Sequence, residues 1–234
     1  MGKWILIPDS FKGTMSSEEI CTVMAAALRR HLPEADIVSV PVADGGEGSV
    51  DAFLTALGGR REEVPCTGPD GRPITAFYGR LPDGTAVVEM AAAAGLPLME
   101  GHLCAEGATT YGVGELLRAA VHAGAKRVIL GLGGSATNDG GCGCAAALGI
   151  HFLDRDGVPF VPVGGTLDRL DRIDASGLDP AVWAAAWWPF WAAGCRWALR
   201  PCWTPSDLTP WCRERRESSP ARDGSTARAC GARW

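Results

Sequence analysis

Residues 127–149 read RVILGLGGSATNDGGCGCAAALG, and three local patterns follow one another in this stretch. The apolar run Arg127–Leu132 predicts a buried strand, and the alanine-rich run 144–149 predicts a helix. Between them, GLGGSATNDGG (131–141) contains Asn138, the only asparagine of the chain. Glycine-rich loops that lead from a strand into a helix are typical of α/β proteins, in which they hold charged ligands.

The same order of strand, loop and helix begins at the N-terminus. Lys3–Pro8 predicts a short buried strand that ends in a polar loop. Ser16 and Glu19 have the spacing of a capping box, and the apolar period behind them predicts a helix to about His31. This first unit has the sequence pattern of a strand and a covering helix.

A second unit follows directly. Residues 37–42 predict a strand, ADGGEG (43–48) a loop, and Val50–Leu57 a helix that a glycine pair closes. Alternation of strands and helices predicts an α/β protein with a parallel sheet. Because ligands bind at the carboxyl ends of such strands, we expect the loops at 9–13 (DSFKG), 43–48 and 131–141 to lie along one edge.

The stretch 61–106 is rich in hairpin signals and fits poorly into a parallel sheet. Its predicted strands are EEVPCT, ITAFYGRL and AVVEM, which GPDG and PDG turns separate. Further along, Thr110–Ala123 predicts a helix and HFLDRDGVPF (151–160) a hairpin. We expect 61–106 to belong to a second subdomain.

The loop 131–141 has the groups that bind an anion. Its glycines leave main-chain N–H groups accessible, and Ser135 and Thr137 add hydroxyl donors. Asp139 does not bind an anion directly, so we expect it to hold Mg²⁺ or to orient a neighbour. A helix-capping turn is the structural alternative. The residues with expected contacts to phosphate or substrate in this loop are Gly133, Gly134, Ser135, Thr137, Asn138 and Gly140.

The two loops nearer the N-terminus supply charge. Lys12, one of three lysines, follows the first strand and can neutralise phosphate or a substrate carboxylate. Asp44 and Glu47 lie among the glycines of ADGGEG, where a turn with a capping acid is the structural alternative. Together the three loops favour phosphoryl transfer, which depends mostly on positioning and charge neutralisation. The sequence lacks both the Gly-Lys-Ser/Thr of a P-loop and the dinucleotide-binding fingerprint.

Composition argues against several other classes of protein. The 234 residues carry a formal net charge of −5, which argues against binding of a nucleic-acid backbone. The apolar run at the N-terminus is too short for a signal peptide, and we expect a cytoplasmic protein. Cysteines and histidines are too scattered for a zinc site, so the nine cysteines are interpreted as small buried thiols.

The composition changes after Pro180. Residues 181–234 contain eight of the nine tryptophans, eight arginines and no lysine. The uncharged run 181–195 is shorter than the roughly 20 residues of a membrane-spanning helix. We favour translation of a GC-rich gene in the wrong frame, because the tail has no amphipathic period. A tryptophan-rich interaction arm is the alternative, and in either case we expect the tail to lie outside the regular fold.

The motifs, taken in order, resemble one known family. PDSFKGTMSSEE, PVADGGEGSVDAF, TTYGVGELLRAA and GLGGSATNDGG are similar to the type 1 glycerate kinases, and the similarity runs from Trp4 to about Pro180. The resemblance implies ATP-dependent phosphorylation of D-glycerate to 2-phosphoglycerate, with Mg²⁺. It also implies a flavodoxin-like parallel sheet with a second α/β domain inserted. The expected domains are 1–60 with 107–150 for the first, 61–106 with 151–180 for part of the second, and 181–234 for the tail.

The resemblance also places residues at motif positions of the family. They are Asp9, Ser10 and Lys12, then Asp44 and Glu47, then Ser135, Thr137, Asn138 and Asp139. We expect Lys12 to bind the glycerate carboxylate or a phosphate. Asp44 and Asp139 are expected as metal ligand and hydroxyl base, in either order.

Two departures from the family pattern change what we expect of this chain. HLCAEG (102–107) stands where the family has an Arg-Asn-Pro-type segment, and the tail replaces further glycine-rich and acidic motifs. We therefore expect a truncated chain with little or no kinase activity. The alternatives are a non-catalytic phosphometabolite-binding protein and an interaction arm in the tail. The expected partner is a small molecule, with no nucleic acid and no membrane.

Overall fold

A computed structural model describes residues 2–11 and 13–185 of the chain. Lys12 and residues 186–234 lie outside the described residues, and so do the interpretations that concern them. Residues 181–185 of the expected tail belong to a short helix, α6 (Pro180–Ala185), so the expectation that they lie outside the regular fold was wrong. Within the described part there are three sheets, with strand orders β1-β2, β3-β4-β5-β6 and β8-β7-β9. The mixture of helices with partly parallel sheets confirms the α/β class.

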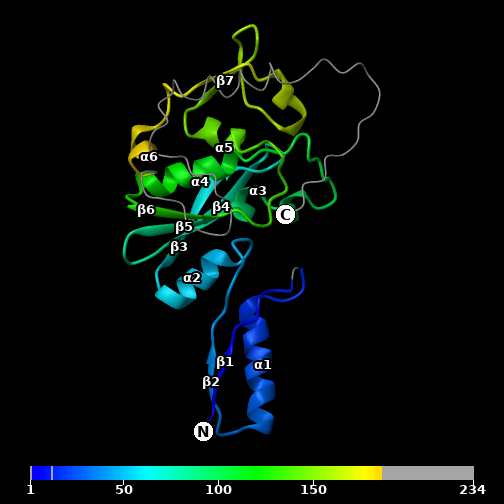
Figure 1. Ribbon diagram of the computed structural model, residues 1–234, viewed down its shortest axis with the longest axis vertical. Coiled ribbons are helices and arrows are strands. Elements are labelled where there is room, and N and C mark those ends of the chain that lie inside the picture. The colour runs from blue at the N-terminus through cyan, green and yellow to red at the C-terminus, as the bar shows by residue number, and fades with distance from the viewer. Residues whose placement is uncertain (1, 12, 186–234) are drawn as a thin grey trace, which may run out of the picture. The chain divides into compact units, whose positions relative to one another are not determined.

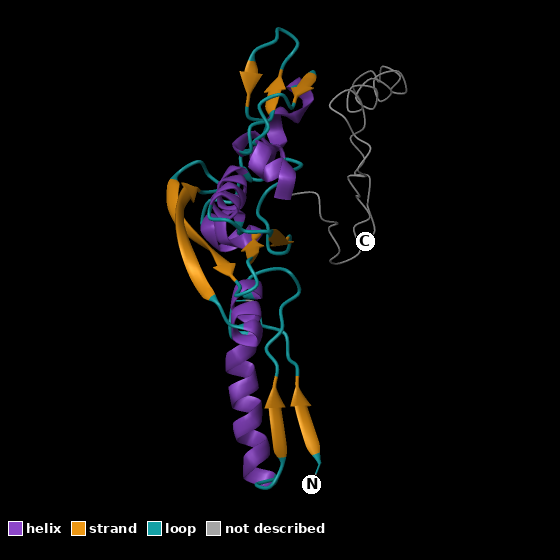
Figure 2. Cartoon of the chain, turned by 90° about the vertical axis from the view of Figure 1, so that its left-hand side faces the viewer, coloured by secondary structure: helices purple, strands orange, loops and turns teal. Residues whose placement is uncertain are grey.

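The first unit has the expected order of strand, helix and strand, but the prediction that its first strand is buried was wrong, because Trp4 and Ile5 are exposed and only Leu6 is buried. β1 (Lys3–Leu6) and β2 (Asp36–Ser39) pair in parallel, and α1 (Ser17–His31) connects them (Figure 2). The capping box is present, because the Ser16 hydroxyl accepts the N–H of Glu19 at 3.2 Å and the Glu19 carboxylate accepts the N–H of Ser16 at 2.7 Å. Buried side chains of β1 and α1 form a small core between the helix and the strands.

A mixed sheet forms the centre of the described part. Its strands are β3 (Arg60–Thr67), β4 (Pro73–Arg80), β5 (Thr85–Glu89) and β6 (Arg127–Gly131). The first three pair antiparallel, whereas β5 and β6 pair in parallel through the crossover helix α4 (Tyr111–His122). The predicted hairpins within 61–106 are therefore confirmed as strands of this sheet.

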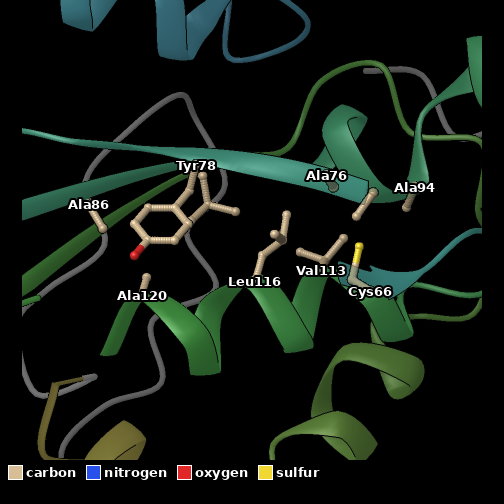
Figure 3. Packing of buried hydrophobic residues seen from close by; sticks show 10 residues of the cluster. Cys66, Ala76, Tyr78, Ala86, Ala94, Val113, Leu116 and Ala120 are labelled. Atoms are coloured by element: carbon tan, nitrogen blue, oxygen red, sulfur yellow. The ribbon is translucent and has the colours of Figure 1, made fainter. Parts of the chain in front are cut away.

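Helices cover both faces of the central sheet, α4 one face and α2 (Ser49–Leu57) the other (Figure 1). Figure 3 shows Leu116 of α4 beside Tyr78 of β4 in the larger core. Successive residues of a strand point to opposite faces. Accordingly Val88 belongs to the core under α4 and Val87 to the core under α2. Every residue of β5 is buried for this reason.

The remaining elements follow the central sheet. They are α3 (Met90–Ala94), the 3₁₀ helix η1 (Leu96–Met99), α5 (Cys142–Ala147), β7 (His151–Leu153), β8 (Pro159–Phe160), the 3₁₀ helix η2 (Gly164–Arg169), β9 (Arg172–Asp174) and α6 (Pro180–Ala185). The predicted hairpin over 151–160 is confirmed by the antiparallel pairing of β7 and β8.

One expectation about the sheet was wrong. We expected the strand at 127–132 to share a sheet with the two N-terminal strands, but β6 pairs with β5 instead. The physical reason is that β5 is apolar on both faces and is paired along both edges, antiparallel to β4 and parallel to β6. The division into a flavodoxin-like domain and an inserted domain stays a prediction.

Candidate active site at two glycine-rich loops

Two of the three expected loops meet through their main chains. We call residues 43–48 the acidic loop and residues 131–141 the glycine loop. The N–H of Gly133 donates to the carbonyl oxygen of Gly45 at 2.9 Å. A Cβ on Gly133 would lie 2.7 Å from the nitrogen of Gly46, and one on Gly131 would collide with the Gly45 carbonyl. This contact therefore requires glycine on both sides.

A segment that the sequence analysis missed holds the other side of the glycine loop. The N–H of Ala136 donates to the carbonyl of Ala94 at 2.8 Å, and the N–H of Leu96 donates to the carbonyl of Gly134 at 3.0 Å. Gly95 also bridges Ser135 in antiparallel fashion. The run AAAAG at 91–95 was the available signal, since such small residues permit close approach of two main chains.

The hydroxyl groups of the glycine loop lie together. The Oγ of Ser135 and the Oγ1 of Thr137 are 2.6 Å apart, and the N–H of Thr137 donates to the Ser135 hydroxyl at 3.1 Å. Both side chains are partly buried, whereas Asn138 and Gly140 next to them are exposed. Hydroxyl and amide groups are therefore presented at the surface of this loop, as anion binding requires.

Asp139 is fixed inside the structure. Its side chain is 1% exposed, and its Oδ2 accepts the N–H and the hydroxyl of Thr110, each at 2.8 Å, and the N–H of Gly143 at 3.1 Å. Its Oδ1 accepts the N–H of Gly141 at 2.9 Å. These bonds join the first residues of α4 to those of α5. They support the expectation that Asp139 orients its neighbours, and they leave it poorly placed to hold a metal ion.

The thiols beside Asp139 are protonated at neutral pH. Burial, reinforced by the charge of Asp139, raises the pKa of the Cys142 thiol to about 11 and that of Cys144 to about 12. A thiol is nucleophilic only as the thiolate. Cys142 and Cys144 are partly buried, whereas Cys104 is exposed, so the interpretation of the cysteines as buried thiols is wrong for Cys104.

The acidic loop presents its carboxylates to solvent. Asp44 and Glu47 are both exposed, and the Oδ1 of Asp44 accepts the N–H of Gly46 at 3.0 Å. The hydroxyl of Ser49 donates to the carbonyl of Gly46 at 2.7 Å and closes the turn. Among residues 2–11 and 13–185 no group of three or more His, Cys, Asp or Glu side chains is arranged to hold a metal ion.

The loop after β1 is connected to the chain just before the acidic loop through the hydroxyl of Ser17. The hydroxyl of Ser17 donates to the carbonyl of Pro8 at 2.6 Å and accepts the N–H of Val42 at 3.0 Å, which ties the ends of the two N-terminal strands together. The N–H of Ser10 donates to the Asp9 carboxylate at 2.7 Å. For the described residues of this loop, no hydrogen bond reaches the glycine loop. Thus the structure brings two of the three loops together.

In the described part of the chain no helix has the length and apolar character needed to cross a membrane.

Several known proteins that are similar to this chain are named glycerate kinases. The chain is 48% identical over 182 residues to a glycerate kinase of Bacillus subtilis, an alignment that covers 76% of this chain and 47% of that protein. It is 44% identical to the glycerate 2-kinase of Escherichia coli, covering 77% of this chain and 48% of that one. Thus the chain spans about half the length of the relatives it matches.

A solved structure shows the same similarity. The crystal structure of a candidate glycerate kinase 2 from Salmonella typhimurium LT2 superimposes with a TM-score of 0.65 at 43% sequence identity, covering 76% of this chain and 48% of that one. The model of the glycerate kinase family matches residues 4–187, which include both loops of the candidate site and every described element except the first residue of β1. The chain therefore belongs to the glycerate kinase family.

Proposed function

We propose that this chain binds ATP and D-glycerate at the two joined loops and takes part in transfer of the γ-phosphoryl group to the 2-hydroxyl of glycerate. The main observation behind this proposal is the main-chain contact between Gly133 and Gly45, which brings a hydroxyl-rich loop against an acidic one. Phosphoryl transfer needs such positioning more than it needs covalent participation of the protein.

The glycine loop is proposed to bind the phosphates. Ser135, Thr137 and Asn138 offer hydroxyl and amide donors, and the exposed Gly134 and Gly140 leave the main chain open to a phosphate oxygen. Lys12, which lies outside the described residues, is proposed from the sequence alone to neutralise a phosphate or the glycerate carboxylate. Asp9 and Ser10 complete this proposal as substrate contacts from the same loop.

The acidic loop is proposed to serve the metal and the hydroxyl group. Asp44 is exposed and is a suitable ligand for Mg²⁺, which is usually coordinated by one or two carboxylates together with substrate phosphates. Asp139 does not fit that role, because both of its oxygens accept main-chain hydrogen bonds inside the protein. When bound, Mg²⁺ supplies neutralisation of the charge on the transferred group.

The proposed reaction balances without a further reactant. The 2-hydroxyl oxygen of glycerate forms a bond to the γ-phosphorus of ATP, and the bond from that phosphorus to the bridging oxygen of ADP breaks. The hydroxyl proton passes to a carboxylate of the acidic loop, for which Glu47 and Asp44 are the exposed candidates. The products are 2-phosphoglycerate and ADP.

Binding without turnover is the second candidate function. It is favoured by Asp139, because a carboxylate that the sequence analysis assigned to the chemistry is occupied in holding α4 and α5 together. A protein of this kind would bind the same small molecules through the glycine loop and leave the phosphoryl group in place. The two-domain division and the cytoplasmic location remain part of the proposal for either function.

One pair of measurements separates the two candidates. Calorimetry on the full chain measures binding of ATP and of D-glycerate with Mg²⁺ present, and phosphorus NMR follows conversion of ATP and identifies the phosphorylated hydroxyl. Formation of 2-phosphoglycerate supports the kinase, and binding without conversion supports the second candidate. Failure to bind either compound contradicts both.

A further inference from the structure

Glu89 is a buried carboxylate that the proposed chemistry does not use. It is the last residue of β5, and its side chain is 2% exposed. Burial raises the pKa of Glu89, whereas hydrogen bonds from the N–H groups of Val50 and Gly48 act in the opposite direction. Burying a carboxylate costs free energy unless it is paired. Its hydrogen-bond partners therefore indicate what it stabilises.

The Glu89 side chain takes the place of a missing helix cap. α2 begins after Gly48, which has a φ of 88° and no side chain with which to cap the helix. The Oε1 of Glu89 accepts the N–H of Val50 at 2.6 Å, and its Oε2 accepts the N–H of Gly48 at 3.3 Å. A negative charge at this end of a helix satisfies unpaired N–H groups and interacts favourably with the helix dipole.

Val50 lies in the first turn of α2, and Gly48 is the last residue of the acidic loop. Three residues earlier, the carbonyl of Gly45 accepts the N–H of Gly133 from the glycine loop at 2.9 Å. Glu89 is also the register partner of Gly131 in the parallel pair β5–β6, so it stands beside the first residue of the glycine loop. The Glu89 carboxylate thus lies at the end of the acidic loop and beside the start of the glycine loop.

The geometry points to Glu89 as a positioning residue that fixes the acidic loop, with Asp44 and Glu47, against the glycine loop. The side chain acts through the main chain of Gly48 and Val50. The test by ligand binding rests on the proposed function, whereas the test by amide exchange is independent of it.

The test compares Glu89→Gln with Glu115→Gln in the full chain. Glutamine keeps the volume of the side chain, but it removes the charge and sets an NH₂ group against one of the two main-chain donors. Glu115 is the matched control, because its carboxylate also accepts a main-chain N–H, that of Thr67 at 2.6 Å, and joins α4 to β3 rather than to either loop.

Amide hydrogen exchange followed by NMR is the first measurement. In Glu89→Gln at least one of the amides of Gly48 and Val50 should exchange about tenfold faster or more, since the NH₂ group cannot accept its hydrogen bond and the charge is lost. Amides of β3 and β4 should keep their rates, and Glu115→Gln should accelerate Thr67 only. Unchanged rates at Gly48 and Val50, or an equal rise throughout β3 and β4, would overturn the positioning role.

Ligand binding is the second measurement. Calorimetry should show ATP and D-glycerate binding to Glu89→Gln about tenfold more weakly than to the wild type, while Glu115→Gln binds as the wild type does. Wild-type affinity in Glu89→Gln would overturn the inference. If the wild type itself binds neither compound, the proposed function fails, and the exchange rates alone decide the role of Glu89. Glu89→Asp, which keeps the charge, replaces Glu89→Gln if that variant does not fold.

Discussion

The carboxylate of Asp139 accepts both the main-chain N–H and the side-chain hydroxyl of Thr110, each at 2.8 Å, across 29 positions of sequence. The hydroxyl of Thr110 in turn accepts the N–H of Cys144 at 2.9 Å. The two side chains thereby link Thr110, the residue before α4, to the N–H groups of Gly143 and Cys144 in the first turn of α5. The glycine loop ends inside this network, so its conformation depends on it.

Asp139→Asn should destabilise the protein strongly. One oxygen becomes an NH₂ group that faces N–H donors, and loss of hydrogen bonds to a buried charge costs about 1.5–3 kcal/mol or more. Thermal denaturation followed by circular dichroism measures the effect. Asp156→Asn, at an exposed position, is the control and should unfold at the wild-type temperature. Equal melting temperatures for the two variants would contradict the structural role of Asp139.

Gly133→Ala should separate the two loops. The added methyl group would lie 2.7 Å from the nitrogen of Gly46, and such crowding typically costs about 1–3 kcal/mol. We expect a lower melting temperature and loss of ATP binding in calorimetry. Gly157→Ala is the comparison, because Gly157 lies in the turn between β7 and β8 and its Cβ would meet no atom within 4 Å, although its φ of 76° adds strain of about 1 kcal/mol. Retained ATP affinity in Gly133→Ala would show that the contact is unnecessary for binding.

Asp44→Asn should weaken Mg²⁺-dependent ATP binding without affecting stability. The Asp44 side chain is exposed and its carbonyl-type oxygen can still accept the N–H of Gly46 after the change, so the fold should be kept. Loss of one carboxylate ligand should reduce the affinity about tenfold or more. Calorimetry with and without Mg²⁺ measures this, with the exposed Asp36→Asn as control. An identical Mg²⁺ dependence in both variants would remove Asp44 from the metal site.

The contribution of Asp70 to stability should depend on pH because Arg72 lowers the pKa of its carboxyl group. A side-chain hydrogen bond from Arg72 is the main cause that lowers the pKa of Asp70 from 3.8 to about 2. Because the folded pKa is depressed, the stabilisation is complete above about pH 3.8 and is lost as the pH falls towards 2. Arg72→Ala should return the pKa towards 3.8 in a carboxyl NMR titration, whereas Arg155→Ala should leave it near 2. An unshifted pKa in Arg72→Ala would contradict this assignment.

Cysteine alkylation should distinguish the exposed thiol of Cys104 from the partly buried thiols of Cys142 and Cys144. Cys104 is exposed, whereas burial raises the pKa of Cys142 to about 11 and of Cys144 to about 12. At pH 8 fewer than about one in a thousand Cys142 thiols would be ionised, so iodoacetamide should modify Cys104 first. Peptide mass spectrometry after a short reaction measures the order. Labelling in 6 M urea, which should remove the difference, is the control.

Local sequence patterns predicted the elements well, because their causes lie within a few residues. The capping box of Ser16 and Glu19 and the hairpin at 151–160 are both set by neighbours in sequence. The strand that pairs with β6 could not be predicted from neighbouring residues in the sequence. It depends on β5, 42 positions earlier in the register, whose residues are buried on both faces by helices that precede and follow the strand.

The site was predicted in part for the same reason. The glycines at 131 and 133 signalled a close approach of main chains, but only the structure shows that the approaching chain is that of Gly45. Glu89 resembles any acid at the end of a strand in the sequence, since the helix end that it caps lies about 40 positions earlier. The sequence could not distinguish the two roles of Asp139, because the same carboxylate can bind a metal ion or accept hydrogen bonds from several N–H groups. The assignment of Lys12 stays a prediction.

The contact between Gly133 and Gly45 is made entirely of main-chain atoms. It has no rotamers to order, no ionisable group and no side chain that evolution could exchange gradually. A substitution at Gly133 therefore strains the main chain itself, whereas a substitution at Ser135, Thr137 or Asn138 changes a side chain and leaves this contact in place. A main-chain contact of this kind fixes the position of the binding loop, and the side chains of the loop then determine which ligand it binds.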